Sequence, residues 1–246
     1  MLGPDSLTDQ VVVITGSSSG IGAALAHEFA AHGASVLVNS ARSVDAGQAV
    51  AASLGDGHYV QASIAEPGGP QAIVDAALDR WGRIDVLVNN AGTTRTIPHH
   101  DLDAASIDIW REIYETNVFG TWEMCRLAAP HLRAQHGSII SITSLAGLRP
   151  TGSSIPYATS KVALNHLTAL LAATLGPDVR VNAIAPGLVD TPWTEDWDTV
   201  RAYVQSVAPL KRSATPGDIV DIALMLATNQ YVTGVVVPVD GGLSLR

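Results

Sequence analysis

Two residues with complementary acid–base chemistry, Tyr157 and Lys161, lie four positions apart in an Ala- and Leu-rich segment. In a helix this spacing places both side chains on one face, and Pro156 just before them suits a first helical turn. A nearby ammonium stabilises a phenolate, so we expect Lys161 to lower the pKa of Tyr157 from its ordinary value of about 10. Such a tyrosine can exchange a proton near neutral pH. Taken alone, such a pair on a helix is more often an ordinary surface contact, so its surroundings decide its role.

A glycine-rich turn near the N-terminus is a candidate phosphate site. Residues 15–22 read T-G-S-S-S-G-I-G and stand between an apolar run and a helical pattern. The free N–H groups and the dipole at a helix N-terminus favour an anion, and glycine lets the backbone approach it closely. The spacing G-x3-G-x-G differs from the common G-x-G-x-x-G, and no Gly-Lys-Ser/Thr follows, which excludes a nucleoside-triphosphate loop. Closing a strand–helix corner without a ligand is the alternative. We predict dinucleotide contacts from Gly16, Ser18, Ser19, Gly20, Ile21 and Gly22.

The end of the second apolar run bears on which dinucleotide is bound. An acidic residue there would hydrogen-bond the adenosine ribose and repel a 2′-phosphate. Ser40 stands at about that position instead, and Arg42 follows. A hydroxyl with a guanidinium suits a phosphate, so we predict that NADP(H) is preferred and that NAD(H) is possible. A solvated Arg42 with a loose cofactor choice is the alternative.

Short apolar runs alternate with helix-length segments along the whole chain. The runs that read as buried strands are Val11–Ile14, Ser35–Asn39, Ile84–Val88, Ser138–Ile142, Val179–Ile184 and Val235–Val239, with a weaker one near His58–Val60. Helical spacing is clearest in Ile21–His32, Gln71–Trp81, Ala105–His131 and Tyr157–Leu175. Strands that are apolar throughout suit a parallel sheet covered on both faces. We therefore predict an α/β, single-domain, doubly wound (Rossmann) parallel sheet of about seven strands with helices on both faces, spanning residues 1–246.

Composition excludes several functional classes. Hydrophobic residues make up 47% and charged residues 15% of the 246, which suits a large buried core. The net charge of −9 disfavours nucleic acid as a partner. No apolar run approaches the roughly 20 residues of a membrane span, and residues 1–10 do not resemble a signal peptide. The single cysteine, Cys125, excludes an internal disulfide. We expect a cytoplasmic protein with no membrane partner.

The chemically important motifs occur in the order and spacing of the short-chain dehydrogenase/reductase family. They are Thr15–Gly22, Asn89-Asn90-Ala91-Gly92, Asn117, Ser144, Tyr157 with Lys161, Pro186-Gly187 and Val239-Asp240-Gly241-Gly242. The similarity runs from about Val11 to Leu243. Within the family the chain most resembles the 3-oxoacyl-carrier-protein reductase type and its ketone- and alcohol-specific relatives.

The resemblance implies a role for each matching residue. Ser144 would hold the substrate oxygen, Tyr157 would be the acid/base, and Lys161 would tune Tyr157 and bind the nicotinamide ribose. Asn117 would help hold a proton-relay water. Further cofactor contacts would come from Asn90, Ala91, Gly92, Pro186, Gly187, Val189 and Thr191. Relatives usually have Asp where this chain has Ser63, followed by Ile64, so adenine binding there is expected to be weaker but retained.

The substrate side is less specified by the sequence. The resemblance places a mobile substrate cover within residues 188–208, where Trp193 and Trp197 could wall an apolar pocket or simply pack a short helix. Arg95 could reach into the same pocket. A metal site at His99-His100 is not expected, because the segment reads as an exposed loop. Charge-poor faces on the long helices, with Leu164, Leu167 and Leu171 at helical spacing, agree with the homotetramer that the resemblance implies.

The sequence thus predicts an NADP(H)-dependent enzyme that interconverts a ketone, or a 3-oxoacyl thioester, and a secondary alcohol. The partner is a small-molecule carbonyl or alcohol. An NAD-dependent dehydrogenase for a sugar, polyol or sterol-type alcohol is the alternative within enzymes. A non-catalytic dinucleotide-binding redox sensor is the alternative outside them, although a sensor would have no need of Ser144, Tyr157 and Lys161 together.

Overall fold

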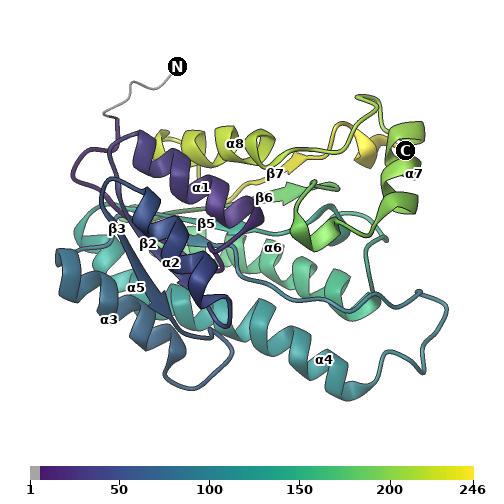
Figure 1. Ribbon diagram of the computed structural model, residues 1–246, viewed down its shortest axis with the longest axis horizontal. Coiled ribbons are helices and arrows are strands. Elements are labelled where there is room, and N and C mark those ends of the chain that lie inside the picture. The colour runs from purple at the N-terminus through teal and green to yellow at the C-terminus, as the bar shows by residue number, and fades with distance from the viewer. Residues whose placement is uncertain (1–5) are drawn as a thin grey trace.

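The runs of Val and Ile form one parallel sheet in the computed structural model, which describes residues 6–246 (Figure 1). The strands lie in the order β3-β2-β1-β4-β5-β6-β7. Their bounds are β1 Val11–Ile14, β2 Ser35–Ser40, β3 Gly57–Gln61, β4 Val86–Asn89, β5 Ser138–Ile142, β6 Arg180–Pro186 and β7 Val236–Val239. The weak run near residue 58 is therefore a strand. β4 begins at Val86, later than expected; just before it, the Asp85 carboxylate accepts from the Val11 N–H at 2.9 Å and from the Arg83 guanidinium at 2.6 Å.

Helices cover both faces of the sheet, which explains why its strands are apolar throughout. Alternate residues of β1 face opposite layers, since Val12 and Ile14 pack in one buried cluster and Val13 in the other. α1 and α8 lie on one face, and α3, α5 and α6 on the other (Figure 1). The bounds are α1 Gly20–Ala31, α2 Val44–Ser53, α3 Gly69–Trp81, α4 Ile107–Tyr114, α5 Thr121–Ala134, α6 Ile155–Leu175, α7 Asp198–Val207 and α8 Pro216–Thr228. The predicted doubly wound α/β fold is confirmed.

The segment 105–131 is not the single α-helix that its apolar spacing predicted. α4 and α5 are joined by a π-helix, Glu115–Gly120, and the helical structure begins only at Ile107. A π-turn widens the backbone locally and is frequent at functional positions. In this protein the π-helix contains Asn117, which is fully buried and accepts a hydrogen bond from the loop that follows β4.

The order of the strands determines where a ligand can bind. The chain moves outward from β1 through β2 to β3, then returns to pair β4 with β1 and continues to β7. At such a reversal the loops after the two central strands diverge and leave a crevice at the carboxyl ends. The glycine turn after β1 and the loop after β4 border this crevice. Within residues 6–246, no helix is both long enough and apolar enough to cross a membrane.

Candidate active site

A single long groove at the carboxyl edge of the sheet brings together residues from distant parts of the chain. Its volume is about 760 Å³, within the range of ligand pockets. Nearly all site residues expected from the sequence line it; the exceptions are Gly22 and Asn117, which lie behind its wall. The lining members are Gly16, Ser18, Ser19, Gly20, Ile21, Ser40, Arg42, Ser63, Ile64, Asn90, Ala91, Gly92, Ser144, Tyr157, Lys161, Pro186, Gly187, Val189 and Thr191.

Two asparagines hold the glycine turn in place. Gly16 has φ +63°, and its N–H donates to the Asn39 side-chain oxygen at 3.2 Å. The Asn90 amide donates to the carbonyls of Thr15 and Gly16 at 3.0 and 2.8 Å. The resemblance implied that Asn90 contacts the cofactor. In the structure its side-chain amide instead donates hydrogen bonds that position the glycine turn. Asn39 has a similar role that the sequence analysis missed, although its place at the end of β2 was a usable signal.

The turn fits the diphosphate of a dinucleotide. A β-carbon at Gly22 would lie 2.5 Å from the Gly16 carbonyl oxygen and 2.6 Å from Asn90 Nδ2, so only glycine lets α1 begin this close to the turn. The N-cap residue Ser19 makes no side-chain hydrogen bond to α1. The first N–H groups of α1 are therefore available to an anion in the groove.

Arg42 and Ser40 mark the adenosine end of the groove but differ in availability. Arg42 is exposed and forms no ion pair within residues 6–246. The Ser40 hydroxyl donates to the Ser43 carbonyl at 3.0 Å and lies 2.8 Å from the Tyr59 hydroxyl. Since Ser40 has one proton, Tyr59 is the donor in the second contact. Ser40 thus has no proton left for a 2′-phosphate, which leaves Arg42 as the anion-binding group of the predicted pair.

Ser63 and Ile64 lie further along the same end of the groove. The Ser63 hydroxyl oxygen accepts from the Ala65 N–H at 3.3 Å, and Ile64 is buried. The serine therefore keeps its own O–H for another acceptor. This arrangement is compatible with the weaker adenine contact expected at this position.

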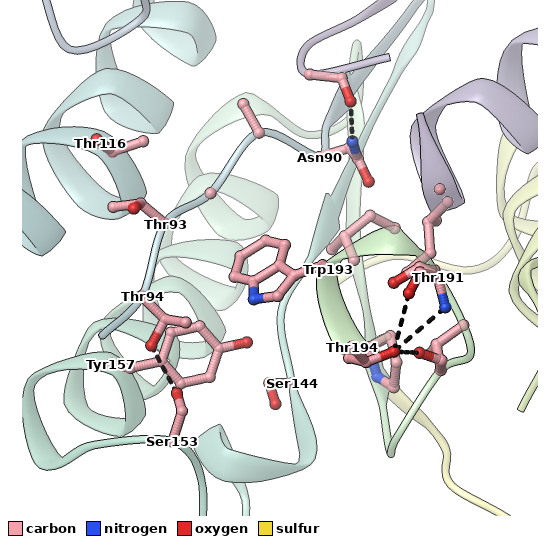
Figure 2. Close-up of a pocket in the computed structure, with 18 of the residues that line it drawn as sticks. Asn90, Thr93, Thr94, Thr116, Ser144, Ser153, Tyr157, Thr191, Trp193 and Thr194 are labelled. Atoms are coloured by element: carbon pink, nitrogen blue, oxygen red, sulfur yellow. Dashed lines mark hydrogen bonds between the residues drawn. The ribbon is translucent and has the colours of Figure 1, made fainter. Parts of the chain in front are cut away.

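At the other end of the groove, Ser144 and Tyr157 lie side by side (Figure 2), and Lys161 of α6 also lines the groove. Ser144 follows β5 and caps the short 3-10 helix Leu145–Gly147, its oxygen accepting from the Ala146 N–H at 3.1 Å. Because the Ser144 oxygen is the acceptor in this contact, the hydroxyl can still donate its proton to another group. Tyr157 lies in the first turn of α6, where Ser154 accepts the Tyr157 N–H at 3.3 Å as N-cap. Pro156 follows Ile155 in this first turn, as predicted.

Lys161 is buried beneath Tyr157. Its ammonium donates to the Ile142 carbonyl at 3.0 Å and lies 5.6 Å from the centre of the Tyr157 ring. Desolvation lowers the pKa of Lys161 to about 8. Desolvation raises the pKa of Tyr157, and the Ser144 hydroxyl offsets part of that rise. The expectation that the pKa of Tyr157 lies below its ordinary value is therefore wrong, because burial acts against the charged forms of both side chains.

Asn117 secures the wall of the groove from behind. Its side-chain oxygen accepts from the Thr93 N–H at 2.8 Å, and its amide donates to the Thr93 carbonyl and the Ser160 hydroxyl, both at 3.0 Å. Ser160 in turn donates to the Tyr157 carbonyl at 2.7 Å. The π-helix is thus tied both to the loop after β4 and to the turn of α6 that contains Tyr157. The side chain is occupied by protein partners, and its expected relay role stays a prediction.

The segment 188–208 forms one wall of the groove. It contains the short 3-10 helix Pro192–Thr194 and α7, and both Trp193 and Trp197 line the groove. Thr191, in the preceding loop, approaches the start of α1, since its methyl would lie 3.3 Å from a β-carbon at Gly20. Arg95 does not line the groove; it forms an ion pair with Glu112 at 2.7 Å.

Other lining residues were not singled out by the sequence, although loops 93–100, 144–154 and 188–208 were expected to build the substrate pocket. Thr94 and Ser153 come from different loops, and their hydroxyls lie 2.6 Å apart at the substrate end. Leu145, Tyr203 and Leu243 add apolar surface there. Their loops meet only in the folded chain. Among residues 6–246, no cluster of three or more His, Cys, Asp or Glu is arranged to hold a metal ion.

Comparison with known proteins gives a consistent result. Residues 16–244 match a family model described as enoyl-(acyl carrier protein) reductase, within the short-chain dehydrogenase/reductase group. A ketoacyl reductase attributed to the granaticin polyketide synthase of Streptomyces violaceoruber is 50% identical over 239 residues, covering 96% of each chain. The 3β-hydroxysteroid dehydrogenase 1 of Eggerthella lenta is 35% identical, covering 98% of this chain and 96% of its own length.

Solved structures agree. A crystal structure of a short-chain type dehydrogenase/reductase from Mycobacterium marinum superposes with a TM-score of 0.90 at 31% identity. The match covers 98% of this chain and 97% of the other. The similarity therefore extends over the whole sheet and its flanking helices.

Proposed function

The chain belongs to the short-chain dehydrogenase/reductase family and is an NAD(P)-dependent oxidoreductase acting on CH–OH or C=O groups; we propose that it is an NADP(H)-dependent carbonyl reductase. In this proposal it interconverts a ketone, or a 3-oxoacyl thioester, and a secondary alcohol, with Tyr157 as the proton donor or acceptor. The observation that supports this best is the meeting of Ser144, Tyr157 and Lys161 in the groove that also contains the glycine turn.

Different residues of the groove would bind different parts of a dinucleotide. The N-terminus of α1, at Gly20 and Ile21, would hold the diphosphate, and Ile64 would lie beside the adenine. Lys161 would hold the nicotinamide ribose. When bound, the nicotinamide supplies or accepts the hydride at the carbon that is reduced or oxidised.

Tyr157 and Ser144 act on the substrate oxygen. Negative charge develops on that oxygen as a ketone is reduced, and donors placed in advance stabilise it. The Ser144 hydroxyl, which also hydrogen-bonds to Tyr157 and lowers its pKa, is one such donor, and Tyr157 donates its proton to form the alcohol. Because burial raises the pKa of Tyr157, the side chain is a neutral phenol at pH 7. A protonated phenol suits the reductive direction.

The cofactor preference rests on Arg42. Its guanidinium is exposed at the adenosine end and has no ion-pair partner within residues 6–246. None of the groove-lining residues of segment 39–43, which contains Arg42, is acidic; the lining carboxylates Glu112 and Glu115 come from α4 and the π-helix. Arg42→Ala should raise the KM for NADPH about tenfold while changing the KM for NADH about twofold or less. An unchanged KM for NADPH would contradict the preference.

The substrate end favours an apolar ketone. Trp193, Trp197 and Tyr203 line it, together with Val200 and Leu243, and no arginine or lysine other than Lys161 lines it. The ketoacyl reductase named above acts in a polyketide synthase, and the hydroxysteroid dehydrogenase on a steroid; both names fit a bulky apolar carbonyl compound. An NAD-dependent sterol-type alcohol dehydrogenase is therefore the second candidate. A redox sensor is less consistent with the three polar groups at the reaction centre.

One experiment separates these candidates. Initial rates are measured for cyclic ketones, 3-oxoacyl thioesters, secondary alcohols and sugars, each with NADP(H) and with NAD(H). The proposal predicts the highest kcat/KM for an apolar ketone with NADPH. A higher kcat/KM for an alcohol with NAD would favour the second candidate, and no turnover of any compound despite dinucleotide binding would favour the sensor.

We also propose a homotetramer in the cytoplasm, with neither nucleic acid nor membrane as a partner. Leu164 faces the interior, but α5, α6 and the π-helix before them expose the large apolar residues Phe119, Trp122, Val162 and Leu170. Exposed apolar groups on adjacent helices favour association with another subunit. Light scattering coupled to size-exclusion chromatography should give four times the chain mass of 25.6 kDa; a monomer would contradict this.

A further inference from the structure

The Trp193 indole lies within the groove itself, between the loop after β4 and the 3-10 helix that contains it (Figure 2). The contacts around Gly92 show how far the Trp193 indole extends into the groove. A β-carbon at Gly92 would lie 3.4 Å from Asn117 Oδ1, 3.7 Å from Lys161 Nζ and 3.8 Å from Trp193 Cη2. The outer edge of the indole thus shares one small volume with the catalytic lysine.

The same volume is needed by the nicotinamide end of a dinucleotide. The groove extends from Arg42, past the start of α1, to Tyr157. A dinucleotide with its diphosphate at Gly20 and its adenosine towards Arg42 must place its other end between Gly92 and Tyr157. Two groups cannot occupy this space together at van der Waals packing density. The indole and the nicotinamide riboside are therefore competitors.

The indole is held in the groove by few interactions. Its residue is 47% exposed, and its N–H has no hydrogen-bond partner within residues 6–246. The backbone under it is firmly fixed, because Thr191 and Thr194 form a reciprocal capping pair and Arg201 donates to the Thr194 carbonyl at 3.0 Å. The side chain can therefore change rotamer, and with it the position of the indole, while the 3-10 helix stays in place.

We propose that Trp193 occupies the nicotinamide position in the cofactor-free protein and must leave it when the dinucleotide binds. The indole acts as an internal competitor that reduces cofactor affinity without touching the adenosine half. If the inserted rotamer holds about nine-tenths of the molecules, the observed Kd is about tenfold weaker than the intrinsic one. This inference rests on dinucleotide binding in the groove, but not on the substrate or the preference for NADP.

Calorimetric titration of Trp193→Ala tests the proposal. We expect the Kd for NADP to fall about five- to tenfold relative to the unmodified chain, while the Kd for adenosine 2′,5′-bisphosphate, which lacks the nicotinamide riboside, stays unchanged. NAD and AMP form the equivalent pair if the chain prefers NAD. Tyr231→Ala is the matched control, because it removes a fully exposed aromatic side chain outside the groove and should change neither Kd.

The outcomes are distinct. Weaker or unchanged NADP binding by Trp193→Ala would overturn the proposal, because it would make the indole a wall or a ligand contact. An equal change for the dinucleotide and its adenosine half would also overturn it, since that indicates a general distortion. Trp193→Leu, which keeps an apolar side chain, serves if the alanine variant does not fold and should give the same pattern. Failure of the unmodified chain to bind either dinucleotide would instead contradict the proposed function.

Discussion

Replacing Lys161 with methionine separates the catalytic need for an ammonium group from its effect on stability. The ammonium is desolvated, and the pKa of Lys161 falls from 10.5 to about 8. This lower pKa corresponds to about 3 kcal/mol of destabilisation while the group is charged at pH 7. Methionine has a similar length and no charge. It forfeits the hydrogen bond to the Ile142 carbonyl and the contact with the Tyr157 ring, which together contribute about 2 kcal/mol.

The variant should therefore be more stable than the unmodified protein at pH 7, by about 1 to 2 kcal/mol, although it cannot turn over. The sign of the pH dependence follows from linkage. Between the folded pKa of about 8 and the unfolded value of 10.5, the unfolded chain binds more protons, so the unmodified protein gains stability as the pH rises. The advantage of the variant should shrink by about 1 kcal/mol between pH 7 and pH 9.

Urea unfolding of both cofactor-free proteins at these two pH values measures the difference. The slopes with denaturant should agree, so that the midpoints report stability alone. A variant that is less stable at pH 7, or an advantage that does not shrink by pH 9, would refute the claim that the ammonium is buried at an energetic cost.

Two further predictions concern residues near the groove. Gly22→Ala should destabilise the protein by about 1 to 3 kcal/mol and weaken dinucleotide binding, because its β-carbon would lie 2.5 Å from the Gly16 carbonyl oxygen; Gly55→Ala, with nothing within 4 Å, is the control for urea unfolding and calorimetry. Cys125 should resist a thiol reagent at pH 8 until the protein is unfolded, because burial raises the pKa of its thiol to about 12. Rapid labelling of native Cys125 would contradict its burial.

The sequence was sufficient for the strands and the glycine turn, because their signals are local. Runs such as Val11–Ile14 are apolar on both faces, and the glycines of residues 16–22 are separated as a close approach requires. The break in the segment 105–131 could not be predicted from apolar spacing. It is accompanied by hydrogen bonds from Asn117 to Thr93 and Ser160, which are far apart in the chain.

In the candidate site, too, some features have local sequence signals and others depend on contacts between distant segments. The family resemblance suggested that Ser144, Tyr157 and Lys161 act together, but the sequence did not give their pKa values. The pKa of Tyr157 depends on burial by distant loops, which a helical spacing cannot report. The commitment of the Ser40 hydroxyl to Tyr59 and Ser43, and the insertion of Trp193 beside Gly92, also arise only when separate elements meet.

The account depends most directly on Tyr157 as the group that moves the proton. Tyr157→Phe keeps the ring and its contact with Lys161 and removes only the hydroxyl. With the best ketone from the substrate panel and NADPH, we predict that kcat falls by about 10²- to 10⁴-fold while the calorimetric Kd for NADP changes by less than about threefold. A phenylalanine variant with near-normal kcat would contradict the assignment of Tyr157 as the proton donor.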